Sequence, residues 1–167
     1  MPENTPLEIL KEAILLERRG RAFYRTVAGQ SAHPDVRDFF DAMAEEESRH
    51  IRILSEQFKA VRKSGRFSPE PLDDEPDTAA ADTVLSSAVR EKISAADFEA
   101  AAISAAMGME EKAIRLYAGR ADAATDPEEA RLYRWLADWE GGHLQALSEM
   151  DRALTEAIWH DNAFWPF

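Results

Sequence analysis

Apolar residues recur at helical spacing along four long segments of the chain. In the first segment Leu10, Ala13 and Ile14 lie three or four positions apart, and charged residues fill many of the positions between them. A period near 3.6 residues is typical of an amphipathic helix, and no long segment alternates apolar and polar residues as a half-buried strand would. The pattern therefore predicts an all-α chain.

Start signals set the expected bounds of these helices. Thr5 and Glu8 form a capping-box pattern with Pro6 at the first helical position, and proline again opens a helix at His33-Pro34 and at Asp126-Pro127. The third long helix is expected to be capped by the segment 94–97. The predicted helices span about 5–28, 33–62, 94–122 and 126–159, with a short helix at about 83–92.

The segment SGRFSPEPLDDEPD, which follows the second helix, holds three prolines in fourteen residues and is predicted to be a connector. Such a link is long for two antiparallel neighbours, so we expect it to cross the molecule. Two tight turns and one crossover predict a bundle in which the helices run up, down, down and up. We expect one domain over residues 1–167.

The two halves of the chain repeat one another. A shift of 93 positions superimposes them without a gap and carries Tyr24 onto Tyr117 and Pro34 onto Pro127. A repeat of this length predicts a duplicated helical hairpin, with halves at about 5–63 and 95–159 and a connector at 64–94. The same shift aligns three pairs of residues that carry chemistry: Glu17 with Glu110, Glu47 with Glu140, and His50 with His143.

Composition and charge exclude several kinds of site and partner. The chain has no cysteine, so disulfides, thiolate metal sites and thiol catalysis are excluded, and a metal would need histidine and carboxylate ligands. A net charge of -12 without a basic stripe argues against nucleic acid and against anionic membranes as partners. The N-terminus lacks a signal-peptide pattern, and no apolar run approaches the roughly 18 residues of a membrane span. We therefore expect a cytoplasmic protein.

Each half supplies one glutamate on its first helix and a Glu-x-x-His pair on its second. Residues three apart share a helix face, and each pair shares that face with apolar residues such as Leu54 and Leu147, so we expect all six groups to point inward. Unpaired, each buried carboxylate would lose on the order of several kcal/mol of solvation. Two divalent cations would balance four carboxylates, and the oxygen and nitrogen donors suit Fe or Mn.

These motifs resemble the rubrerythrin branch of the ferritin-like superfamily over nearly the whole chain. The segments that carry the resemblance are Glu17, EESRH at 46–50, Glu110 and EGGH at 140–143. The resemblance implies a ferritin-like four-helix bundle that binds two Fe ions, with Mn or Zn as other occupants of the purified protein. It also implies bridging acids Glu47 and Glu140, terminal acids Glu17 and Glu110, one histidine per metal (His50 and His143), and tyrosines that hydrogen-bond to the ligand carboxylates (Tyr24 and Tyr117).

The chain departs from that family at two points. Rubrerythrin peroxidases carry a further glutamate one turn after the ligand of the third helix, where this chain has Ala113, which argues against their redox-linked ligand exchange. They also append a cysteine-rich electron-transfer domain, so we expect electrons from a separate donor protein or from Fe(II) itself.

The leading hypothesis is a di-iron oxidoreductase that reduces O2 or hydrogen peroxide, with peroxidase and ferroxidase action both left open. One alternative is an iron-binding or storage component. Another is a helical interaction protein that keeps the metal ligands for stability alone.

Other features support weaker expectations. The acids beside the ligands, Glu45, Glu46 and Glu111, are expected to be solvated flanks or groups behind the ligands, with an iron entry path as the alternative. Gly141 and Gly142 interrupt a helix, which predicts either close approach of another backbone, as across a homodimer or higher homo-oligomer interface, or a gap that admits the oxidant. The aromatic-rich tail at 158–167 is expected to cover its own bundle or to dock on a partner subunit.

Overall fold

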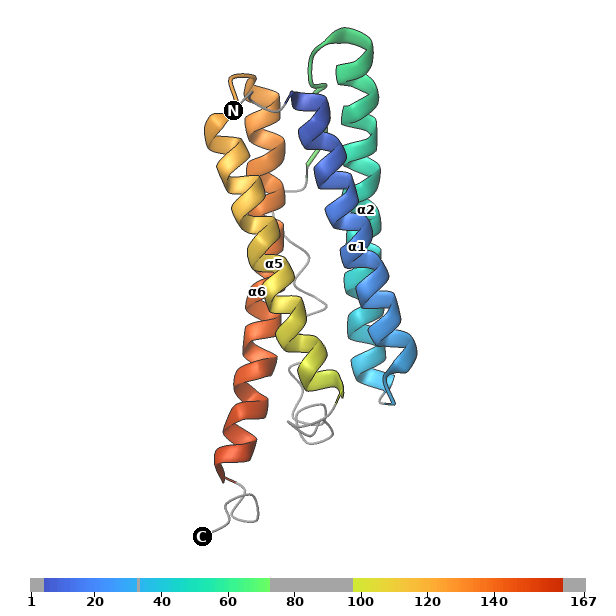
Figure 1. Ribbon diagram of the computed structural model, residues 1–167, viewed down its shortest axis with the longest axis vertical. Coiled ribbons are helices and arrows are strands. Elements are labelled where there is room, and N and C mark those ends of the chain that lie inside the picture. Colours follow the sequence, from blue (N-terminus) through green and yellow to red (C-terminus); the bar gives the residue numbers. More distant parts are fainter. Residues whose placement is uncertain (1–4, 33, 73–97, 161–167) are drawn as a thin grey trace.

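The computed structural model describes residues 5–32, 34–72 and 98–160, and these residues form four long helices (Figure 1). Within the described ranges there is no strand, which confirms the predicted all-α class. The short helix expected at about 83–92 and the tail beyond residue 160 lie outside the described residues. No helix among those described is long and apolar enough to cross a membrane. The helix bounds are α1 Pro6–Gln30, α2 Pro34–Ser64, α5 Phe98–Ala123 and α6 Pro127–His160.

Local chemistry explains where α1 begins and where α2 ends. The Thr5 hydroxyl accepts a hydrogen bond from the Glu8 amide at 3.3 Å, and the Glu8 carboxylate accepts one from the Thr5 amide at 2.8 Å. This is the capping box that the sequence predicts. Directly after the last residue of α2, Gly65 adopts a positive φ of 72° and donates its amide to the Val61 carbonyl at 2.8 Å. Only glycine adopts this left-handed turn at little cost.

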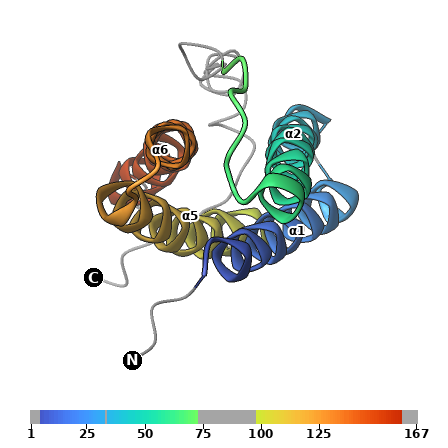
Figure 2. The same cartoon turned by 90° about the horizontal axis from the view of Figure 1, so that it is seen from above.

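The four helices form two hairpins that meet along α1 and α5. α1 packs against α2 and α5 packs against α6, and seen from above α2 and α6 lie on the same side of the α1 and α5 pair (Figure 2). α2 ends at the opposite end of the bundle from the start of α5 (Figure 1). This is the predicted up, down, down, up order with one crossover.

The core is divided into two apolar clusters, one toward each end of the bundle. In one cluster Tyr24 stacks on Phe40 with ring centroids 6.0 Å apart, and in the other Tyr117 stacks on Tyr133 at 5.9 Å. The shift of 93 positions carries the first stacked pair onto the second. Along α1 the second cluster includes Ala13 and the first begins at Tyr24, so the middle of the bundle is left for other residues.

Candidate metal centre

The six acids and histidines singled out by the repeat lie between the two apolar clusters. α1 and α5 each contribute one of them, and α2 and α6 each contribute two. None is more than 7 % exposed, so their charges are removed from bulk water. The residues are Glu17, Glu47, His50, Glu110, Glu140 and His143.

The six residues form two overlapping groups of four. In each group the candidate ligand atoms all lie within 4.8 Å of one another. One group consists of Glu17, Glu47, His50 and Glu140, and the other of Glu47, Glu110, Glu140 and His143. The α2 and α6 acids belong to both groups, so each could reach two ions at once.

Glu140 lies between the two imidazole rings. Its Oε1 is 3.0 Å from Nδ1 of His50, and its Oε2 is 2.9 Å from Nδ1 of His143. Despite these short distances, neither Glu140 oxygen nor Nδ1 of His143 has a hydrogen-bond partner in the described part of the chain. Buried polar atoms without a partner are rare and costly in proteins. A divalent cation held by these atoms would satisfy all three, so the donor set fits a metal.

Burial and mutual repulsion raise the pKa of two of the acids. Burial is the largest cause of a pKa of Glu47 well above its usual value, and the charges of Glu17 and Glu140 add to it. Burial and the charge of Glu140 also raise the pKa of Glu110 to about 7, although His143 opposes the shift. Without metal, the cluster therefore reduces its negative charge by holding protons.

The pKa values of both histidines are raised, although burial alone would lower them. Burial would lower the pKa of His50, but the charge of nearby Glu140 and the contact of Nδ1 with Glu17 raise it to about 9. Burial would likewise lower the pKa of His143, yet its carboxylate neighbours raise it well above the usual value. Two imidazolium charges in turn lower the pKa of Glu140, against the effect of its own burial. The cluster thus attracts positive charge.

Two buried tyrosines hold the α1 and α5 acids, and each does so across the hairpins. Tyr24 of α1 donates its hydroxyl to Glu110 of α5, and Tyr117 of α5 donates to Glu17 of α1. Burial, followed by the neighbouring carboxylate charges, raises the pKa of both phenols well above 10, so both remain donors. The sequence predicted tyrosine contacts with carboxylates, and the structure adds that the partners exchange between the halves.

Sequence reasoning did not single out Trp139, and it left Glu46 open between a solvated flank and a group behind the ligands. Oε2 of Glu46 lies 2.6 Å from Nε2 of His143 and accepts a hydrogen bond from Nε1 of Trp139 at 2.7 Å. The two residues are 93 positions apart, so each occupies the place of the other in the repeat. In the sequence, Glu46 and Trp139 differ directly before the aligned pair Glu47 and Glu140, and this difference could have drawn attention to both residues. Glu45 and Glu111, by contrast, are exposed and lie 3.4 and 3.5 Å from arginines.

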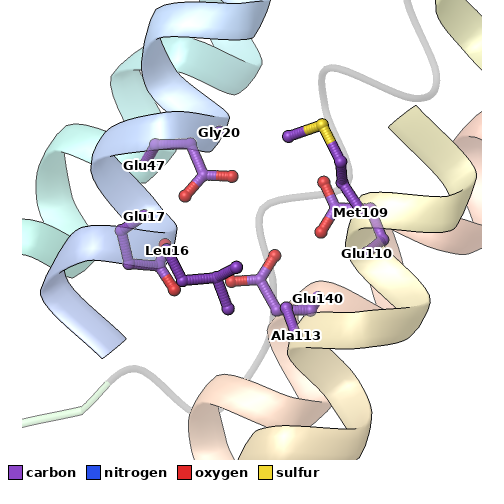
Figure 3. A pocket seen from close by; sticks show the side chains of 8 residues that line it. All are labelled: Leu16, Glu17, Gly20, Glu47, Met109, Glu110, Ala113 and Glu140. Atoms are coloured by element: carbon purple, nitrogen blue, oxygen red, sulfur yellow. The ribbon is translucent and has the colours of Figure 1, made fainter. Parts of the chain in front are cut away.

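A pocket of about 20 Å³ lies between α1 and α5 and ends at the carboxylates (Figure 3). Gly20 and Glu47 both line it, and a Cβ added to Gly20 would lie 3.2 Å from Oε1 of Glu47. A volume on this scale holds about one water molecule. The residues around it are four pairs related by the repeat: Leu16 and Met109, Glu17 and Glu110, Gly20 and Ala113, and Glu47 and Glu140.

Gly141 does not have a close neighbour within the described chain. A Cβ added there would meet no atom within 4 Å. The close backbone approach suggested by the sequence is therefore not made at this residue by the described part of the same chain. An interface between copies stays a prediction.

Comparison with known proteins gave one match. A family model described as Rubrerythrin matches residues 8–151, a range that contains all six buried acids and histidines. Searches of the curated proteins and of the solved structures found no match.

We predict that the metal-free protein loses stability as pH rises from about 5 to about 9. Between pH 4.5 and about 7 the folded chain keeps a proton on Glu110 that the unfolded chain releases, and His50 does the same between pH 6.5 and about 9. Stability from a raised pKa is present at low pH and is lost through that window. Because one pKa unit is worth about 1.4 kcal/mol, the fall should be on the order of a few kcal/mol. Urea unfolding of chelator-treated protein across this range measures it, and constant or rising stability would contradict the assignment.

A second prediction compares two glycines inside helices. Alanine favours a helix interior by about 1 kcal/mol over glycine, and at exposed Gly108 the new methyl group would meet no atom within 4 Å. Gly108→Ala should therefore stabilise the chain. At Gly20 the new Cβ would press on Glu47, so Gly20→Ala should lose that gain and weaken metal binding. Equal stabilisation by both variants, with metal affinity unchanged in both, would show that Glu47 is not confined there.

Proposed function

The chain belongs to the rubrerythrin family, and we propose that it binds two Fe ions in its buried cluster and uses them to reduce O2 or hydrogen peroxide. The observation that carries the proposal is the position of Glu140. Both of its oxygens are buried, face an imidazole Nδ1 and lack a hydrogen-bond partner among the described residues. Two cations relieve this arrangement more completely than protons do, because each would also bind the neighbouring carboxylates.

The proposed ligand sets follow the two groups of four. One ion would be held by Glu17 and His50, and the other by Glu110 and His143. The shared acids Glu47 and Glu140 would bind both ions. Four carboxylate charges balance two divalent ions, and a set of hard oxygen donors with one imidazole per ion suits Fe or Mn.

The residues of the chain would position the carboxylates, surround the site with apolar side chains and give the oxidant access to it. Bound as Fe(II), the pair of ions would supply the electrons that reduce the oxidant. Tyr24 and Tyr117 fix the carboxylates of Glu110 and Glu17 by hydrogen bonds. Apolar clusters lie on either side of the site, and a pocket of about 20 Å³ between α1 and α5 reaches its carboxylates. That pocket would admit a molecule about the size of water as far as the four carboxylates.

Ala113 limits which reaction of the family is proposed. It lines the pocket at the place where rubrerythrin peroxidases carry a further glutamate, and a methyl group cannot bind a metal. We therefore propose that each ion keeps the same ligand set throughout the reaction. Electrons for repeated turnover would come from a separate donor protein, or from Fe(II) that is itself consumed.

We predict that the metal-free protein binds two equivalents of Fe(II) without O2 and oxidises them when O2 or hydrogen peroxide is added. Glu110→Gln should bind only one equivalent tightly, because a terminal carboxylate is lost. Glu111→Gln is the matched control, since it removes the same charge from the next residue of α5, where Glu111 is exposed and lies 3.5 Å from Arg115. Anaerobic titration followed by ultraviolet and visible absorption measures both binding and oxidation.

Three results of that experiment have distinct meanings. Failure of the unaltered chain to bind two equivalents contradicts the two-metal site. Binding of two Fe(II) ions that neither oxidant oxidises contradicts the redox function and favours a purely stabilising role. Equal loss in both variants shows that net charge, and not ligation by Glu110, controls binding.

A further inference from the structure

The two histidines of the cluster differ in what contacts the outer nitrogen of the ring. Nε2 of His143 lies 2.6 Å from Oε2 of Glu46. Nε2 of His50 is buried and has no hydrogen-bond partner among the residues that the structure describes. The repeat aligns the two histidines, and both turn Nδ1 toward Glu140.

Two tryptophans of α6, Trp135 and Trp139, contact the His50 ring, and the repeat aligns them with Ala42 and Glu46 of α2. Where α2 has Glu46, α6 has Trp139, and the Trp139 ring lies perpendicular to His50 with centroids 5.8 Å apart. An indole ring has an N–H donor and no acceptor lone pair in its plane. It therefore cannot accept a hydrogen bond from Nε2 of His50 as a carboxylate would.

The Glu46 contact also determines which nitrogen of His143 carries the proton. The indole N–H of Trp139 can only donate, so Oε2 of Glu46 acts as an acceptor in that 2.7 Å bond. We take the same carboxylate oxygen to accept from Nε2–H of His143. Nδ1 of the neutral ring then keeps its lone pair, directed toward Glu140. The guanidinium of Arg49 lies over the Trp139 ring, 5.0 Å from its centroid, in a cation–π contact.

We propose that Glu46 is a positioning residue that makes the two metal positions unequal, so that the position formed by Glu110 and His143 fills first. The proposal rests on the two-metal site proposed above. A carboxylate that fixes the orientation and tautomer of a ligating histidine typically strengthens metal binding by about 10- to 100-fold. The position formed by Glu17 and His50 lacks this support and binds the second ion.

A purely structural role for Glu46 makes a different prediction. Its hydrogen bond with Trp139 joins α2 to α6, so its loss could loosen the bundle. Such loosening would affect both metal positions, because Glu47 of α2 and Glu140 of α6 belong to both groups. Selective weakening of one binding step therefore separates positioning from general support.

The test uses Zn²⁺ as a diamagnetic probe with the metal-free full chain. Calorimetry gives the affinities of the two steps, and ¹⁵N chemical shifts of the imidazole rings show which histidine binds in each step. In the unaltered chain the His143 signals should move with the first equivalent and those of His50 with the second. Glu46→Leu, which keeps the bulk and removes the acceptor, should weaken the His143 step by about 10- to 100-fold.

Two further variants complete the test. Glu46→Gln preserves the shape and one acceptor oxygen. It should reduce the difference in affinity between the two binding steps by less than the leucine variant does. Glu45→Gln is the control, because Glu45 is exposed beside Arg25 and does not touch the cluster. Its two steps should match those of the unaltered chain.

The outcomes separate this inference from the proposed function. Fewer than two equivalents of Zn²⁺ bound by the unaltered chain contradict the two-metal site itself. If the two equivalents bind with equal affinity, the positioning role is overturned and the two-metal site stands. The same holds if neither Glu46 variant changes the difference in affinity between the two steps. Should the leucine variant not fold, the glutamine variant alone decides between these results.

Discussion

The structure depends on the cost of placing four carboxylates in the dry centre of a helical bundle. Removing each from water costs on the order of several kcal/mol, and repulsion among them adds to that cost. The surrounding chemistry supplies positive charge or protons. The histidines have raised pKa values, two tyrosine hydroxyls donate into the cluster, and Glu47 and Glu110 bind protons more strongly than usual. Two bound cations would neutralise the same four carboxylates without these protons.

Duplication explains how one short chain builds such a site. A single hairpin supplies three of the candidate ligands, and its repeat supplies the matching three from the other side of the bundle. The exchange of tyrosine contacts between the hairpins makes each half incomplete without the other. Symmetry also makes its exceptions informative. Where α2 has Glu46, α6 has Trp139, so the His143 ring has a carboxylate at Nε2 and the His50 ring has no acceptor there among the described residues.

The helices, their order and the six central residues followed from periodicity, proline positions and the repeat, because these signals are local or recur at a fixed distance. The sequence left Glu46 open between a solvated flank and a group behind the ligands, because its helical position places it at the edge of the inward face. Only the packing of α6 against that edge brings Nε2 of His143 within 2.6 Å. The crossed tyrosine contacts depend on how the two hairpins meet, which neither helix encodes alone. Gly20 was missed because its meaning depends on the distance to Glu47 on another helix.

The most direct test of this account is the number of protons released when metal binds. Calorimetric titration of the metal-free chain with Zn²⁺ at pH 7, repeated in buffers of different ionisation enthalpy, gives that number. If cations replace protons as the charges that neutralise the buried cluster, binding should release about one or more protons per ion. Binding without proton release would show that the acids and histidines of the metal-free protein do not hold the protons assigned to them, and would contradict the account.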